Sequence, residues 1–136
     1  LERAELLGAH YKELDWMIPA PAQGAIGVVC RTSDFSFIEQ LQKINHQPTQ
    51  TCVAIERDFL RTLEGGCTAP IGAHAFFLQD KIHFKGGVFS LDGRNAVITQ
   101  KEEDLSANEN LAFEAAHEVL SKGGDKIMET IKCGKG

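Results

Sequence analysis

The sequence lacks any apolar run long enough to cross a membrane. A crossing helix needs about 20 consecutive apolar residues, and every apolar run here is far shorter. The first residues, 1–5, resemble neither a signal peptide nor a transit peptide. We therefore expect a soluble, cytoplasmic protein with no membrane partner.

An excess of positive charge is also missing. The chain has 14 Lys and Arg against 19 Asp and Glu, a formal net charge of -5. A phosphate backbone repels such a chain, so we expect no nucleic-acid partner. A local basic pocket is still compatible with this overall charge.

Cysteine is sparse and widely spaced. No Cys-x-x-Cys pair is present, which disfavours a structural zinc site. The pair His117-Glu118 begins like a zinc protease helix motif, but Ser121 stands where the second histidine is required. We therefore expect no metal site. In an intracellular protein all four thiols should be reduced, and their surroundings decide which one reacts. The four are Cys30, Cys52, Cys67 and Cys133.

The composition is that of a folded domain. The 136 residues are 43% hydrophobic and 24% charged, which suits one main core. The sequence begins with Leu1 inside a helical pattern that reaches Leu14, which suggests a piece of a longer chain. The apolar run 25–30 has no polar alternation and predicts a strand buried on both faces. A second helix follows it, with Asp34 or Ser33 as N-cap.

The rest of the chain is typical of an α+β domain. Apolar residues at three- and four-residue steps predict a helix over 49–63 that ends at Gly65-Gly66. Aromatic and β-branched stretches separated by turn residues then predict an antiparallel meander. Its strands are expected over 71–78, 82–90 and 96–100.

Two helices are expected to close the domain, over 105–122 and 125–131. The predicted fold is thus α+β, a small three-stranded antiparallel sheet covered by helices. A helix and a strand-helix segment precede it. We place a boundary near Asn45, because a lone buried strand cannot satisfy both of its edges by itself.

Cys67 is the best candidate for a reactive side chain. It follows two glycines at a helix-to-strand junction, where little can shield its sulfur. Arg57 and Arg61 lie four residues apart on one helix face, and Arg31 ends the predicted strand. Guanidinium groups suit the capture of carboxylates and would favour a reactive thiolate nearby. The plainer alternative for each arginine is a surface ion pair with a neighbour such as Glu56, and most loop cysteines are inert.

Three blocks of the sequence closely resemble the porphobilinogen deaminase family, also called hydroxymethylbilane synthase. Agreement is dense from Pro19 to Gly72, and beyond Gly72 only the order of strands and helices fits. The block with two glycines, a cysteine and a following proline is highly specific. The three blocks are residues 21–31 (PAQGAIGVVCR), 56–60 (ERDFL) and 63–72 (LEGGCTAPIG).

The resemblance implies a division among three domains. In this family two α/β domains surround a cleft, and a small α+β third domain carries the cofactor. Residues 1–20 would then be the tail of the second domain, and residues 21–45 a return segment of the first. Residues 46–136 would be the complete C-terminal, cofactor-carrying domain.

The resemblance also implies roles for individual residues. Cys67 matches the cysteine that carries a dipyrromethane cofactor through a thioether. Arg31 and Arg57 match arginines that bind the acetate and propionate side chains of the pyrroles. Gln23 with Gly24 matches the cleft segment near the reacting pyrrole.

The activity implied is that of a transferase of tetrapyrrole and heme biosynthesis. Such enzymes condense porphobilinogen units, with loss of ammonia, into the linear tetrapyrrole hydroxymethylbilane. The implied partners are porphobilinogen and the growing oligopyrrole, and the intact enzyme is expected to be a monomer. Two positions depart from the family, Ala22 where glycine is usual and Val29 where glutamate is common.

The catalytic aspartate of the family would precede the residues present here. We therefore expect no catalytic residue in this chain, no activity from it alone, and a free Cys67 thiol without cofactor. The alternative is a non-catalytic small α+β interaction module, in which Cys67 is a structural loop residue.

Overall fold

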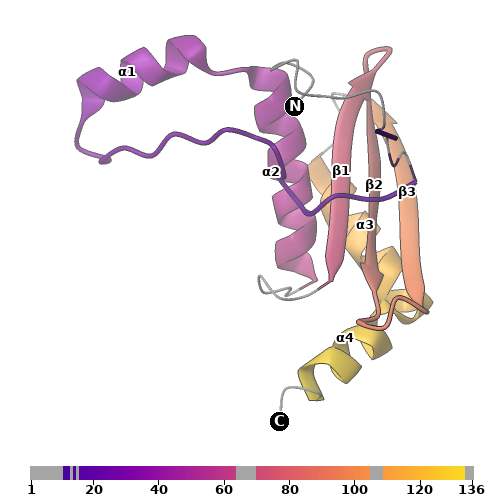
Figure 1. The fold of residues 1–136 in the computed structure, drawn as a ribbon. Helices are drawn as coiled ribbons and strands as arrows, with labels where there is room; N and C mark the ends of the chain where they lie inside the picture. Colours follow the sequence, from indigo (N-terminus) through magenta and orange to yellow (C-terminus); the bar gives the residue numbers. More distant parts are fainter. Residues whose placement is uncertain (1–10, 13, 15, 64–69, 105–108, 134–136) are drawn as a thin grey trace.

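The computed structural model describes residues 11–12, 14, 16–63, 70–104 and 109–133 (Figure 1). Two helices precede a sheet, and two more follow it, joined by a π-helical turn. In chain order the elements are α1 (Phe35–Ile44), α2 (Gln47–Thr62), β1 (Ile71–Leu78), β2 (Lys81–Phe89), β3 (Ala96–Asp104), α3 (Leu111–Val119), the π-helical turn (Leu120–Gly124) and α4 (Asp125–Cys133).

The three strands form one antiparallel sheet in the order β1-β2-β3, which confirms the predicted fold class. Gln79 and Asp80 join β1 to β2 with φ of 51° and 62°, the left-handed conformation that two-residue hairpin turns need. β3 ends four residues later than predicted, because its polar end still pairs with β2. Asp104 at this end lies opposite Lys81.

The core lies between one face of the sheet and the helices α2 and α3 (Figure 1). Side chains alternate across each strand, so one face of the sheet is buried and the other is open. The Phe59 ring of α2 meets the Phe84 ring of β2 edge to face, at 5.0 Å between centroids. A Cβ on Gly86 would lie 2.7 Å from the Phe84 ring and 2.9 Å from the Phe59 ring, so this strand position requires glycine.

Residues 16–45, which we call the arm, are packed far less than the rest. α1 begins at the predicted place, with the side chain of Asp34 accepting a hydrogen bond from the amide of Phe37, but it has no buried residue. Figure 1 shows the extended chain crossing the strands before it reaches α2, and then α1 standing to one side of α2, away from the sheet.

The predicted buried strand over residues 25–30 is wrong. Among the described residues this segment pairs with no strand, and Ile26 and Val29 are 90% and 94% exposed. The apolar pattern indicated burial, but a doubly buried strand needs neighbours on both edges and cover on both faces. The described part of the chain provides neither.

The helix predicted over residues 1–14 lies mostly outside the described residues, and its described end is not helical at Tyr11, Lys12 or Leu14. Both closing helices are present, as α3 and α4, but α3 covers only Leu111–Val119 of the predicted range 105–122, and residues 105–108 lie outside the described residues. Between them Gly123 has φ of 101°, which breaks the helical path. No helix in the described ranges is both long enough and apolar enough to span a membrane.

Candidate functional site

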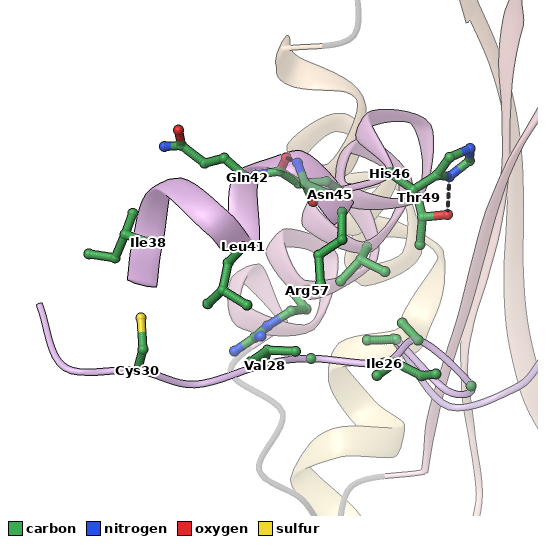
Figure 2. Close-up of a pocket in the computed structure, with 17 residues that line it drawn as sticks. Ile26, Val28, Cys30, Ile38, Leu41, Gln42, Asn45, His46, Thr49 and Arg57 are labelled. Atoms are coloured by element: carbon green, nitrogen blue, oxygen red, sulfur yellow. Dashed lines mark hydrogen bonds between the residues drawn. The ribbon is translucent and has the colours of Figure 1, made fainter. Parts of the chain in front are cut away.

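A groove of about 870 Å³ lies between the arm and α2 (Figure 2). One wall is the extended segment 24–30, the second is α1, and the third is the exposed side of α2. The segment and α1 place apolar side chains along it, among them Ile26, Val28, Ile38 and Leu41.

The end of the groove near the start of α2 is polar. His46 Nδ1 lies 2.8 Å from Thr49 Oγ1, and Asn45 Nδ2 donates to Gln50 Oε1 at 2.6 Å. These residues lie at the junction of α1 and α2, and no sequence motif singles them out. Their helix-starting position was the only available signal.

Arg57 is the one arginine or lysine among the described lining residues, and none of these is an aspartate or glutamate. Figure 2 shows its side chain extending from α2 toward the segment that carries Val28. Within the described ranges no carboxylate lies within ion-pair distance of Arg57. Arg61 differs, since its Nη1 pairs with Asp58 Oδ1 at 2.6 Å on the exposed surface. Among the described residues, a surface ion pair is therefore present for Arg61 and not for Arg57.

The other residues singled out from the sequence lie as follows. Gly24 lines the groove with φ of 82°. Gln23 is exposed, and its Oε1 accepts a hydrogen bond from the Ala20 amide at 3.2 Å. Arg31 is exposed, one residue beyond the lining residue Cys30. Cys67 lies outside the described residues. The structure thus brings Gly24 and Arg57 to one groove and leaves Gln23 and Arg31 outside its lining.

Two of the cysteines are described as free thiols with different surroundings. Cys52 is buried in the core, and its burial, followed by the charge of Glu56, raises the pKa of its thiol. Because the thiolate is the reactive form, Cys52 is a packing residue. Cys30 is half-buried and lines the groove. No group of three or more His, Cys, Asp or Glu is placed to hold a metal ion within the described ranges.

Glu56 is the residue that the sequence reasoning missed. Its charge predicts a surface partner for an arginine, but it is only 6% exposed. Its Oε2 accepts a hydrogen bond from the Ala22 amide at 2.6 Å, and its Oε1 accepts one from the Ala75 amide at 2.7 Å. The available signal was helical spacing, since Glu56 shares a face with Cys52 and Phe59. A carboxylate buried on that face needs such partners.

Comparison with known proteins gives one consistent family. The model of "Porphobilinogen deaminase, C-terminal domain" matches residues 50–121, slightly more than half of the chain. These residues include α2 from residue 50 onward, the whole sheet and α3. The match therefore covers most of the packed part of the structure and leaves out the arm and α4.

Curated proteins named porphobilinogen deaminase match over most of this chain. That of Carboxydothermus hydrogenoformans is 43% identical over 119 residues, which are 87% of this chain and 38% of the relative. That of Alkaliphilus metalliredigens is 38% identical over 123 residues, 90% of this chain and 39% of the relative. That of Thermobifida fusca is 35% identical over 133 residues, 91% of this chain and 42% of the relative.

This chain thus spans about two fifths of the length of these relatives. The match to the domain model and the matches to the relatives agree on the same family. Both confirm the resemblance seen in the sequence blocks, so this chain belongs to the porphobilinogen deaminase family and contains its C-terminal domain.

Proposed function

We propose that this chain is part of an enzyme that condenses porphobilinogen units, with loss of ammonia, into the linear tetrapyrrole hydroxymethylbilane. Family membership supports the proposal, and one structural observation supports the groove as the binding site. Arg57 lines an apolar-walled groove with no carboxylate among the described lining residues. Each pyrrole of the substrate carries two carboxylates, and a guanidinium on a rigid helix suits their bidentate capture.

The proposed division of the chain follows the contrast in packing. Residues 46–136 would be the cofactor-carrying domain, residues 21–45 a return segment of a first cleft domain, and residues 1–20 the tail of a second. In support, the main hydrophobic core draws its residues only from Cys52 onward. The exposed apolar segment 25–30 has the pattern of a strand that is buried elsewhere in a larger protein.

A dipyrromethane group has two pyrrole rings and four carboxylates, and the groove can be tested against it. The volume of about 870 Å³ lies in the range of ligand pockets, which is about 300–1,000 Å³. Its apolar walls suit the rings, Arg57 suits one carboxylate, and the described lining has no acid to repel the others. The group therefore fits, with Arg57 as one holder and further cations needed for the remaining carboxylates. Arg31 is proposed as one of these.

Cys67 is proposed as the covalent anchor. A thiolate is a soft nucleophile, and it would form a carbon–sulfur bond with the methylene carbon of porphobilinogen as ammonia leaves. Once bound, the group would supply a fixed terminus from which the oligopyrrole grows. Gly24 and Gln23 are proposed to lie near the reacting pyrrole, and the left-handed turn at Gly24 lets the backbone bend there without a side chain.

The lining of the groove also limits what this chain can do alone. Proton transfer to departing ammonia needs an acid near the reacting carbon, and the described lining has no aspartate or glutamate for this role. We therefore propose that the 136 residues alone bind the substrate without turnover and keep a free Cys67 thiol. Consumption of porphobilinogen in a colorimetric assay, or an intact mass that includes an added dipyrromethane, would contradict this.

Arg57→Ala tests the groove as a carboxylate site. Isothermal titration of this chain with porphobilinogen should show binding that Arg57→Ala weakens about tenfold or more, because a hydrogen-bonded charge pair contributes about 1.5–3 kcal/mol. Arg61→Ala is the matched control, since Arg61 lies one turn later on α2 and already pairs with Asp58. It should leave the affinity unchanged. Equal weakening by both variants, or no binding by the unaltered chain, would contradict the assignment.

A further inference from the structure

Glu56 joins two segments that are distant in the sequence. One carboxylate oxygen accepts from the Ala22 amide in the arm and the other from the Ala75 amide in β1, at 2.6 Å and 2.7 Å. His74 is a third neighbour, with its Nδ1 3.7 Å from Glu56 Oε1. Both strong acceptors of a buried carboxylate are thus used by backbone donors, which is how such a charge is accommodated.

The arm segment held by Glu56 crosses β1 at Gly72 and reaches the free edge of this strand (Figure 1). We call residues 18–24 the strap. Next to the Glu56 contacts, the Ala73 amide donates to the Pro19 carbonyl oxygen at 3.0 Å. Ile18 is buried and lies so close to Gly72 that a Cβ there would come within 2.9 Å of the Ile18 side chain. The strap is therefore held by side-chain packing at Ile18, a backbone hydrogen bond at Pro19 and the bond from the Ala22 amide to Glu56. The contact with Glu56 is the one nearest the groove.

The end of the strap is a strained turn. Ala22 has φ of 61° and Gly24 has φ of 82°, both in the left-handed region. This conformation costs a residue with a Cβ about 1–2 kcal/mol, so Ala22 adopts it only where other contacts hold it. The bond from its amide to Glu56 is such a contact. Release of this bond would free the turn to leave the left-handed conformation.

Glu56 and Arg57 are consecutive residues of α2 with opposite surroundings. Glu56 is buried toward β1, whereas Arg57 is exposed and lines the groove. The wall formed by residues 24–30 begins directly after the turn that Glu56 holds. One helix therefore carries both the group that fixes the start of the wall and the cation that the wall faces across the groove.

We propose that Glu56 is a positioning residue. Its two carboxylate oxygens fix the turn at Ala22–Gly24 on the edge of β1, and they thereby hold the wall 24–30 opposite Arg57. That the groove receives pyrrole carboxylates rests on the proposed function. The two-amide contact itself does not, so the two claims can fail separately.

Amide hydrogen exchange of the full 136-residue chain, read by NMR, tests the contact directly. In the unaltered chain the Ala22 amide should exchange at least tenfold more slowly than those of Ile26 and Gly27 in the neighbouring exposed wall. This comparison needs no substitution, so it remains decisive even if a variant fails to fold. Equal exchange at the three amides would overturn the proposal.

Variants of Glu56 then separate positioning from general stability. Glu56→Ala removes both acceptors, and the Ala22 and Ala75 amides should both exchange at least tenfold faster. Glu56→Gln keeps one acceptor oxygen, so the variant should still fold. At least one of the two amides should lose its protection from exchange. In both variants the exchange rates of the core amides of Phe84 and Val88 should be unchanged. If Glu56 only stabilised the fold as a whole, exchange of all four amides would become faster together.

The matched control is Asp58→Asn, which alters an exposed carboxylate two residues further along the same helix. It should leave the exchange rates of the Ala22 and Ala75 amides unchanged. The position of the wall is read separately from the rate at which iodoacetamide alkylates the half-buried Cys30, mapped by peptide mass. This rate should rise at least threefold in Glu56→Ala and stay the same in Asp58→Asn. An unchanged rate would overturn the claim that Glu56 holds the wall.

The outcomes distinguish this proposal from the proposed function. In one outcome the Glu56 variants lose amide protection, and Arg57→Ala does not change the affinity for porphobilinogen. This result would support the positioning role and refute the carboxylate site. Protection that survives in Glu56→Ala, together with binding that depends on Arg57, would refute the positioning role and leave the site standing.

Discussion

The helices α1 and α2 follow each other in the sequence, and both carry an apolar stripe at helical spacing. They differ in how far this stripe is buried. α2 buries residues against the sheet and α3, whereas α1 buries none. The stripe on each predicts a helix equally well. The difference shows that an amphipathic pattern fixes the local conformation, while burial depends on a partner surface elsewhere in the chain.

The same contrast separates the packed part of the molecule from the arm. The packed part has a continuous core that runs from α2 through the sheet to α3. The arm has Ile18 as its one buried apolar residue among those described, and leaves several large apolar side chains exposed. If burial is what distinguishes the two, matched substitutions should have large effects in the packed part and small ones in the arm.

Phe59→Ala should give the largest effect. Phe59 is fully buried in contact with Phe84, and truncation of such a ring costs about 3–5 kcal/mol of unfolding free energy. Phe35→Ala is the matched change in the arm, at a residue 73% exposed, and should stay within about 0.5 kcal/mol. Equilibrium denaturation in urea measures both. Similar losses in the two variants would contradict the contrast in packing.

Gly86→Ala should give an intermediate effect. The added methyl would overlap the rings of Phe84 and Phe59, and overpacking of this kind costs about 1–3 kcal/mol. Gly27→Ala is the control in the arm, since a Cβ there meets nothing within 4 Å. Its unfolding midpoint should be unchanged or slightly raised. A destabilised Gly27→Ala would show that the wall is more tightly packed than this structure has it.

Glu118→Gln should give the smallest effect, and one that depends on pH. Glu118 of α3 pairs with Lys101 of β3 at 2.8 Å and with Lys122 at 2.6 Å. Hydrogen bonds from Lys101 and then Lys122 lower the pKa of Glu118 from an ordinary 4.5 to about 2. Because the folded pKa is the lower one, these pairs stabilise the fold above about pH 4.5, and the stabilisation is lost as the pH falls toward 2.

Thermal unfolding of Glu118→Gln and the unaltered chain across this pH range is the measurement. The melting temperature of the variant should be lower at pH 7, and the difference should narrow steadily below pH 4.5. The effect is small because these side chains lie at the surface, with Glu118 and Lys101 28% exposed and Lys122 57% exposed, and surface ion pairs contribute little. A difference that stays constant from pH 7 to pH 3 would show that the two lysines do not act through the charge of Glu118.

The sequence predicted most of the packed part because its periodicities come directly from burial in one core. Helix α2 and the three strands follow alternations that the core imposes. The apolar pattern did not predict the polar end of β3. That end is held by pairing with β2 and by Lys81 Nζ, which donates to Glu102 Oε1 at 2.6 Å. A residue-by-residue apolar pattern does not record such cross-strand partners.

The arm and the site were predicted less completely, for two physical reasons. The run 25–30 has the composition of a buried strand, but composition does not say which edges and faces will meet it. Glu56 was missed because its charge suggested the surface, whereas two backbone amides make burial favourable. The family resemblance indicates Gly24, and both helical spacing and the resemblance indicate Arg57, but their meeting in one groove required the fold.

The strap has a consequence for how the sheet behaves toward other chains. An outer strand with free amides is a template on which a second molecule can add its own strand. Here the amides of Ala73 and Ala75 already donate to Pro19 and Glu56, so these two donors of the β1 edge are not free to pair with another strand. The opposite border, β3, ends in charged residues from Lys101 to Asp104, which discourage stacking between molecules. A single buried glutamate thus helps to keep a small, open-faced sheet from polymerising.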